Sequence, residues 1–119
     1  MIERDRKAIE RVIHHIELIN QYMKPISTLD NFTTNSIIQD AVVFNLLQIG
    51  EIAKTRLSDG IKGQHPYIPW NKLYGFRNRL VHDYTSIILN VVFDVIVEDL
   101  ETLNKQIKSI LLWATFGFS

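Results

Sequence analysis

The sequence of 119 residues predicts an all-α protein: an antiparallel bundle of four main helices, with a shorter helix that carries the segment Arg-Asn-Arg-Leu-Val-His-Asp-Tyr at 77–84. Apolar residues recur at intervals of three and four along most of the chain, and no convincing stretch alternates with a period of two. A hydrophobic content of 46% is enough to build one core. We therefore expect a single helical domain over residues 1–119.

The first helix is expected to end just before Pro25, because the residue that precedes a proline disfavours the helical conformation. Its apolar residues form one stripe, made of Ile2, Ile9, Val12, Ile13, Ile16, Ile19 and Met23. A short connection over residues 27–30 then leads to a second helix, from about Asn31 to Leu57. The middle of this second helix, residues 41–49, is apolar on more than one face and needs cover on most sides. In a domain of this size, we expect a second copy of the chain to supply part of that cover.

The segment from Ser58 to Pro66 is rich in glycine and polar residues, and is predicted to be the one real loop of the chain. Pro69 suits the first turn of a third, shorter helix, which is expected to end near Val81 or His82. A fourth helix is expected from about Asn90 to Ala114. Its β-branched start has low helix propensity, but the apolar spacing continues through Ile110. The aromatic tail at 111–118 is expected to pack on the bundle, and the alternative is that it contacts a partner.

Composition excludes several kinds of chemistry. The chain has no cysteine, which rules out disulfides and thiolate catalysis and removes the commonest zinc ligand. His14 and His15 are adjacent, so one helical face cannot present both to a metal, and His65 is expected in the loop. No metal or cofactor is therefore expected.

No membrane segment is predicted. The largely apolar stretches at 87–97 and 110–118 fall short of the roughly 20 residues that cross a bilayer. The N-terminus lacks the apolar region of a signal peptide. The sequence therefore predicts a cytoplasmic protein.

Charges are segregated along the chain although the formal net charge is zero. Residues 54–82 contain six cations against one acid, whereas residues 83–103 contain five acids and no Lys or Arg. One interpretation is two differently solvated faces. The other is a basic surface that meets nucleic acid through residues such as Lys72 and Arg79, with the acidic helix facing away or meeting a partner.

Residues 77–84 combine Arg77, His82 and Tyr84 within one short segment. The planar guanidinium of an arginine can bind and neutralise a phosphate, and an imidazole can exchange protons near neutral pH. Such a pair can cleave RNA without a metal, because the histidine can take a proton from a ribose 2′-hydroxyl or give one to the leaving oxygen.

Together with the upstream segments Ile68-Pro69-Trp70-Asn71-Lys72-Leu73-Tyr74-Gly75-Phe76 and Leu47-Gln48-Ile49-Gly50-Glu51-Ile52-Ala53-Lys54, this segment resembles the HepT-like ribonucleases of the HEPN superfamily, whose signature is Arg-x-x-x-x-His-x-Tyr. The resemblance runs from about Ile2 to Ile110. It implies that Arg77 and His82 are the catalytic pair and that Asn78 supports them. It further implies a dimeric toxin, silenced when a nucleotidyltransferase antitoxin transfers AMP to Tyr84.

A straight helix does not unite the catalytic pair, since its period places Arg77 and His82 roughly 140° apart and Arg77 and Tyr84 within roughly 20°. Either the helix ends near His82 and the chain turns, or a partner copy completes the site across a two-fold axis. We favour the composite site.

Further residues are candidates for supporting roles. Glu51 lies in a mostly apolar stretch and needs a partner, so it either orients Arg77 or Arg79 or caps a local network. Gly50 is expected to permit close helix packing. Trp70 and Tyr74 could stack on bases, but aromatic residues at helical spacing more often belong to a core.

The sequence thus predicts a metal-independent RNA endonuclease. The alternative is a non-catalytic helical module that binds a nucleotide, or recognises a substrate, for a neighbouring nucleotidyltransferase. A purely structural helical dimer is the third interpretation, and it gives no reason for the motif.

Overall fold

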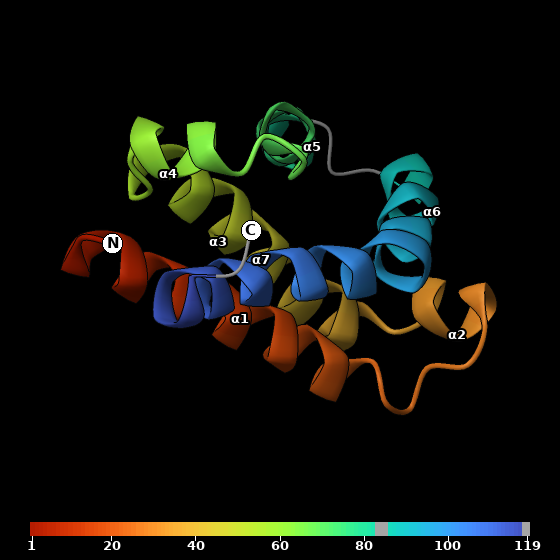
Figure 1. The fold of residues 1–119 in the computed structure, drawn as a ribbon. Coiled ribbons are helices and arrows are strands. Elements are labelled where there is room, and N and C mark those ends of the chain that lie inside the picture. The colour runs from red at the N-terminus through yellow and green to blue at the C-terminus, as the bar shows by residue number, and fades with distance from the viewer. Residues whose placement is uncertain (83–85, 118–119) are drawn as a thin grey trace.

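The computed structural model describes residues 1–82 and 86–117, and in this part of the chain every regular element is helical. The prediction of an all-α protein is confirmed. Helix α1 packs on α3, α3 packs on α5, and α7 packs along α1 (Figure 1). These principal helices are α1 (Glu3–Tyr22), α3 (Ser36–Thr55), α5 (Trp70–His82) and α7 (Leu100–Phe116). Their arrangement as an antiparallel four-helix bundle stays a prediction.

The core lies between α1, α3 and α7, where the apolar stripes of the three helices meet. The largest fully buried side chains there are Ile9, Ile16, Ile19, Val42, Ile107 and Ile110. The expected stripe of the first helix is confirmed except at Ile2, which lies at the exposed end of the chain. Helix α1 ends at Tyr22, before Pro25, as predicted.

The predicted second helix is wrong in one respect, because the chain forms two helices there. Helix α2 (Leu29–Thr33) ends before Asn35, whose backbone is extended. The Thr28 hydroxyl accepts a hydrogen bond from the Asn31 amide at 3.1 Å, and the Asn35 side chain accepts one from the Ile38 amide at 3.0 Å. Each side chain satisfies a free amide of a first turn, so two capping residues close together start two helices.

The predicted loop from Ser58 to Pro66 is also wrong, because most of it forms α4 (Asp59–Gln64). The Ser58 hydroxyl accepts a hydrogen bond from the Ile61 amide at 3.3 Å and caps this helix. The buried Asp5 carboxylate of α1 in turn accepts hydrogen bonds from the Ser58 amide and hydroxyl, at 2.8 and 2.7 Å. This distant contact fixes the cap, and no local pattern reveals it.

Helix α5 matches the predicted third helix closely, whereas the fourth is more irregular than expected. It begins earlier than Asn90, as α6 (Ser86–Asp94), and continues through a π-helical turn, η1 (Val95–Asp99), into α7. Figure 1 shows α6 and α7 running in different directions, with η1 at the bend. A π-turn holds one extra residue in the helical ladder and is a recognised cause of such bends.

By length and apolar composition alone, α3 could cross a bilayer. The prediction that no apolar segment is long enough to do so is therefore corrected. Half of its most apolar window is buried inside the domain. The central helix of a globular core can have the same length and the same apolar composition.

Candidate active site

The site is built where α5 crosses α3 at Gly50. A Cβ atom added at Gly50 would lie 2.5 Å from Cβ of Arg77 and 2.9 Å from its Cγ. Such distances are shorter than any van der Waals contact, so glycine is required for α5 to approach this closely. The expectation that Gly50 permits close packing is confirmed, and the residue packed against it is Arg77.

Glu51, the next residue, holds the guanidinium of Arg77. Nη2 of Arg77 lies 3.0 Å from Oε2 of Glu51, and Nη1 donates a hydrogen bond of 3.0 Å to Oδ1 of Asn78. Of the two arginines considered for Glu51, the structure selects Arg77. The side chains are 29% exposed for Arg77 and 44% for Glu51, so solvent screening keeps the contribution of this pair to stability small.

These contacts orient the Arg77 guanidinium but use only part of its hydrogen-bond donors. A guanidinium carries five N–H donors, and within residues 1–82 and 86–117 the contacts to Glu51 and Asn78 use only two of them. The fork is therefore held on one side while its remaining donors can bind a phosphate.

His82 lies in the last turn of α5 and is exposed. Because α5 remains helical through this residue, the helical period directs His82 roughly 140° away from Arg77. The structure brings Glu51, Arg77 and Asn78 together and leaves His82 apart from them. Tyr84 lies outside the described residues.

The remaining cations of α5, Lys72 and Arg79, are exposed. They are seven residues apart and therefore lie within roughly 20° of each other on the helix. Lys62 belongs to the same basic stretch of the sequence, but its amine is bonded within the domain. Its Nζ donates to the Ala53 carbonyl at 3.1 Å and to the Tyr74 hydroxyl at 2.8 Å. The basic surface is thus smaller than the charge count indicates.

The aromatic candidates belong mainly to the core. Trp70 is buried, and its Nε1 donates to the His65 carbonyl at 3.1 Å, so its ring is closed to a base. Tyr74 is half-buried beside Lys62, whose Nζ lies 5.2 Å from its ring centre. The core interpretation of both residues is supported.

The histidines differ in burial, and His65 lies outside the helices, as the sequence predicts. His15 is buried and its Nδ1 lies 2.7 Å from Oδ1 of Asn45, whereas His14 is exposed. His65 is buried at the end of α4, and burial lowers its pKa from the ordinary value of 6.5. Among the described residues, no group of three or more carboxylates and histidines is placed to hold a metal ion.

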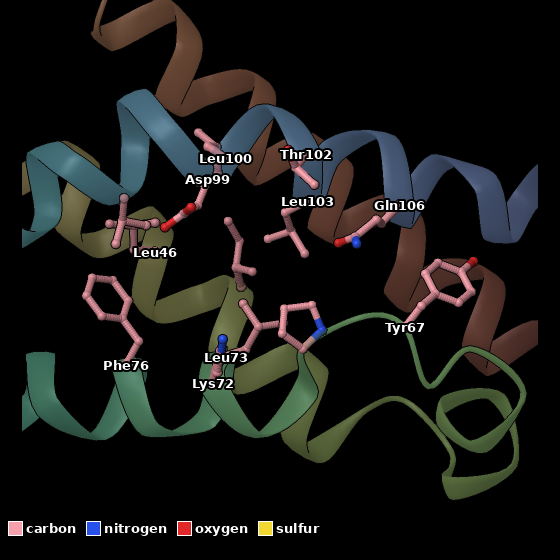
Figure 2. Close-up of a pocket in the computed structure, with 14 residues that line it drawn as sticks. Leu46, Tyr67, Lys72, Leu73, Phe76, Asp99, Leu100, Thr102, Leu103 and Gln106 are labelled. Atoms are coloured by element: carbon pink, nitrogen blue, oxygen red, sulfur yellow. The ribbon is translucent and has the colours of Figure 1, made fainter.

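A pocket of about 470 Å³ opens between α5, α3 and the segment from η1 to α7. Figure 2 shows Phe76 and Lys72 on the α5 side, and Asp99 and Gln106 on the opposite side. Sequence reasoning missed this pocket. The only signal was the acidic run that contains Asp99, because residues so far apart in sequence meet only through the tertiary fold.

A helical domain that presents a carboxylate-held arginine and an exposed histidine on one helix has the groups that a ribonuclease needs. Residues 12–110 match the family described as Ribonuclease HepT-like. The chain therefore belongs to the HepT-like ribonuclease family, and it is a ribonuclease.

Curated relatives agree with this assignment. A protein of Caldanaerobacter subterraneus, named as a candidate RNase, is 28% identical over 89% of this chain and 93% of its own length. A protein of Thermococcus cleftensis, named "Probable ribonuclease HepT", is 29% identical over 86% of this chain and 91% of its own. A protein of Methanocaldococcus jannaschii, whose name joins gamma-glutamylcyclotransferase to a candidate RNase, is 30% identical over 87% of this chain but only 46% of its own length. No solved structure matches the chain.

Proposed function

We propose that the protein is a metal-independent endoribonuclease that cleaves RNA by attack of a ribose 2′-hydroxyl on the adjacent phosphate. The observation that carries this proposal is the anchoring of Arg77 by Glu51 and Asn78 on the helix that also bears His82. A fixed guanidinium with free donors can stabilise the charge that develops on the phosphate in the transition state.

In this mechanism the imidazole of His82 exchanges the protons. As a base it removes the proton of the 2′-hydroxyl, and as an acid it protonates the departing 5′-oxygen. Arg77, helped by Asn78, binds the phosphate. One product then ends in a 2′,3′-cyclic phosphate and the other in a 5′-hydroxyl.

This chemistry is tested with a labelled RNA in EDTA, beside the same RNA carrying a single 2′-deoxynucleotide at the mapped cleavage position. The proposal expects cleavage of the all-ribose RNA with cyclic phosphate ends, and no cleavage at the deoxy position. Cleavage at the deoxy position, or a strict requirement for magnesium, would exclude the mechanism.

We further propose that the active form is a homodimer whose partner completes the site. Ile37, Phe44 and Glu51 are spaced seven residues apart on α3 and so lie along one stripe of the helix. The side chains of Ile37 and Phe44 are 81% and 57% exposed, and two large apolar side chains on one stripe of a helix can form part of an interaction surface. A second copy that covers them lies beside the Glu51–Arg77 pair, where it can supply His82.

Mixing two inactive variants, Arg77→Ala and His82→Ala, tests this composite site. If each site takes its arginine from one copy and its histidine from the other, mixed dimers regain one intact site, and random mixing restores about a quarter of wild-type activity. If each copy holds a complete site, the mixture stays as inactive as its parents.

As the toxin of a toxin–antitoxin pair in the cytoplasm, the enzyme is proposed to be silenced by a nucleotidyltransferase that transfers AMP to Tyr84. Tyr84 follows His82 by two residues in the sequence, and an attached AMP would add bulk and negative charge that compete with the RNA phosphate for Arg77. Incubation with ATP and a nucleotidyltransferase encoded beside the gene should add the mass of AMP and stop cleavage. Tyr84→Phe should stay active and unmodified, and silencing that persists in Tyr84→Phe would contradict the proposal.

A further inference from the structure

The pocket between α5 and the segment from η1 to α7 has an apolar floor and a few polar groups at its edges. Its floor is formed by apolar side chains of three elements, including Leu46, Ile49, Leu73, Leu100 and Leu103. Its volume of about 470 Å³ lies within the range of about 300–1,000 Å³ that is usual for small-molecule sites. Such a pocket is suited to a flat, largely apolar group that carries hydrogen-bonding edges.

The polar groups come from opposite walls. The Lys72 amine rises from α5, while the Asp99 carboxylate and the Gln106 amide are directed into the same space from the other wall (Figure 2). Asp99 is the last residue of the π-turn and the N-cap residue of α7, yet its side chain caps no amide of that helix. Among the residues that the structure describes, none forms an ion pair or a hydrogen bond with this carboxylate. Its acceptor oxygens are therefore available to a ligand, and π-turns occur frequently at functional sites.

The two walls also differ in charge. Lys72 and Arg79 lie on the same side of α5, whereas Glu98 and Asp99 stand on η1. A polyanion is attracted to the α5 wall and repelled by the η1 wall. An RNA strand that follows the Lys72 and Arg79 side of α5 thus keeps its phosphates on the basic wall, and its bases can point toward Asp99.

We propose that this pocket binds a nucleobase of the RNA substrate, close to the phosphate held by Arg77, and that Asp99 recognises an exocyclic amino group of that base. This inference rests on the proposed ribonuclease function and adds a base preference to it. Gly50, which packs against Arg77, lines the pocket together with Phe76, so the base site adjoins the phosphate site at the crossing of α3 and α5. The Phe76 ring offers an aromatic surface against which a base can stack.

The chemistry of Asp99 determines which bases are accepted. A carboxylate only accepts hydrogen bonds, and adenine, cytosine and guanine each carry an exocyclic amino group that can donate one. Uracil has a carbonyl oxygen where cytosine has its exocyclic amino group, and this oxygen repels a carboxylate that faces the same edge. The pocket should therefore favour amino-bearing bases over uracil.

The direct test is titration of the full-length protein with CMP and, separately, with UMP, followed by NMR of leucine and valine methyl groups. CMP should shift the signals of Leu46 and Leu103, and UMP should bind about tenfold more weakly, the effect of one hydrogen bond to a charged group. Asp99→Asn should weaken CMP binding by a similar factor and bring the two nucleotides close together. Glu98→Gln, a neighbouring acid that does not line the pocket, is the matched control and should bind like the wild type.

Several results would overturn the proposal. Equal binding of CMP and UMP, equal behaviour of Asp99→Asn and Glu98→Gln, or shifts confined to the region of Arg77 and His82 would each exclude base recognition by Asp99. Methyl shifts that follow protein concentration, and not nucleotide concentration, would identify the pocket as a contact between copies of the chain.

Failure of this inference can be distinguished from failure of the proposed function. The binding titration needs no cleavage, so it stands even if the wild type does not cut RNA. If the wild type cuts RNA, Asp99→Asn should still cut it, with the discrimination against uridine at the cleavage site reduced about tenfold. Cleavage with an unchanged base preference in Asp99→Asn would reject the pocket and leave the ribonuclease intact.

Discussion

At the scale of single residues, the site depends on a glycine, a carboxylate and an arginine that meet at one helix crossing. Gly50 lets α5 approach α3, and Glu51 then reaches the guanidinium of Arg77 at 3.0 Å. Both roles could be anticipated from the sequence, because a glycine and an acid in an apolar helix each need a physical reason. The choice of Arg77 over Arg79 could not, since it depends on how α5 is rotated against α3.

Gly50→Ala is expected to destabilise the fold and reduce activity together. The added methyl group would overlap Arg77, and forcing extra volume into a packed site typically costs about 1–3 kcal/mol. Urea unfolding and RNA cleavage measure the two effects. Gly75→Ala is the control on α5, because its methyl meets nothing within 4 Å and should stabilise the helix by roughly 0.5–1 kcal/mol. Equal behaviour of the two variants would show that the crossing at Gly50 is not tight.

Glu51→Gln tests a positioning role for the carboxylate. The variant keeps the shape of the side chain but releases the guanidinium, so kcat should fall roughly ten- to hundredfold, while the free energy of unfolding changes by less than about 1 kcal/mol because the pair is partly exposed. Glu101→Gln breaks the exposed pair with Lys105, whose atoms lie 3.9 Å apart, and should change neither quantity. A large loss of stability with unchanged kcat would assign Glu51 a purely structural role.

At the scale of elements, contacts between distant segments decide the features that the sequence did not predict. Helix α4 replaces an expected loop because Asp5 holds its cap, and the π-turn inserts a bend into an expected straight helix. His65 joins the end of α4 to α7, since its Nδ1 lies 3.0 Å from the Tyr67 hydroxyl, which lies 2.9 Å from Oγ of Ser109. Its ring also meets Trp113 edge-on, so part of the aromatic tail packs on the bundle as predicted.

This junction should make stability depend on pH. Burial lowers the pKa of His65 below 6.5 in the folded state, so between the folded and unfolded pKa values the unfolded chain binds more protons. The contribution of His65 is therefore complete above pH 6.5 and is lost as the pH falls through the folded pKa. Unfolding free energies at about pH 7.5 and about pH 5.5 should differ more for the wild type than for His65→Phe, which cannot titrate. Equal differences in the two proteins would contradict this origin.

At the scale of the whole molecule, the domain carries apolar residues that its own core does not cover. Ile37 and Phe44 of α3 are exposed to solvent, and it stays a prediction that a second copy of the chain covers them. The all-helical class and the motif helix could be predicted from periodicity, because both depend on local pattern. The pocket that contains Asp99 could not, because its walls come from segments far apart in sequence.

Phe44→Asp is expected to separate the proposed dimer. A charge placed in an apolar interface is costly to desolvate, whereas at an exposed position of a monomer it is tolerated. Analytical ultracentrifugation should find a dimer for the wild type and a folded monomer with little activity for Phe44→Asp. Ile2→Asp, an exposed apolar residue at the chain end, is the control and should remain a dimer. A wild type that sediments as a monomer and still cleaves RNA would reject the composite site.

We propose that Arg77 and His82 together perform the ribonuclease reaction. Its most direct measurement is cleavage of a labelled RNA in EDTA by the wild type, with Tyr84 verified as unmodified by mass, beside His82→Ala. We predict cleavage by the wild type that leaves 2′,3′-cyclic phosphate ends and disappears in His82→Ala. Equal cleavage by both proteins, or none by the unmodified wild type, would contradict the assignment.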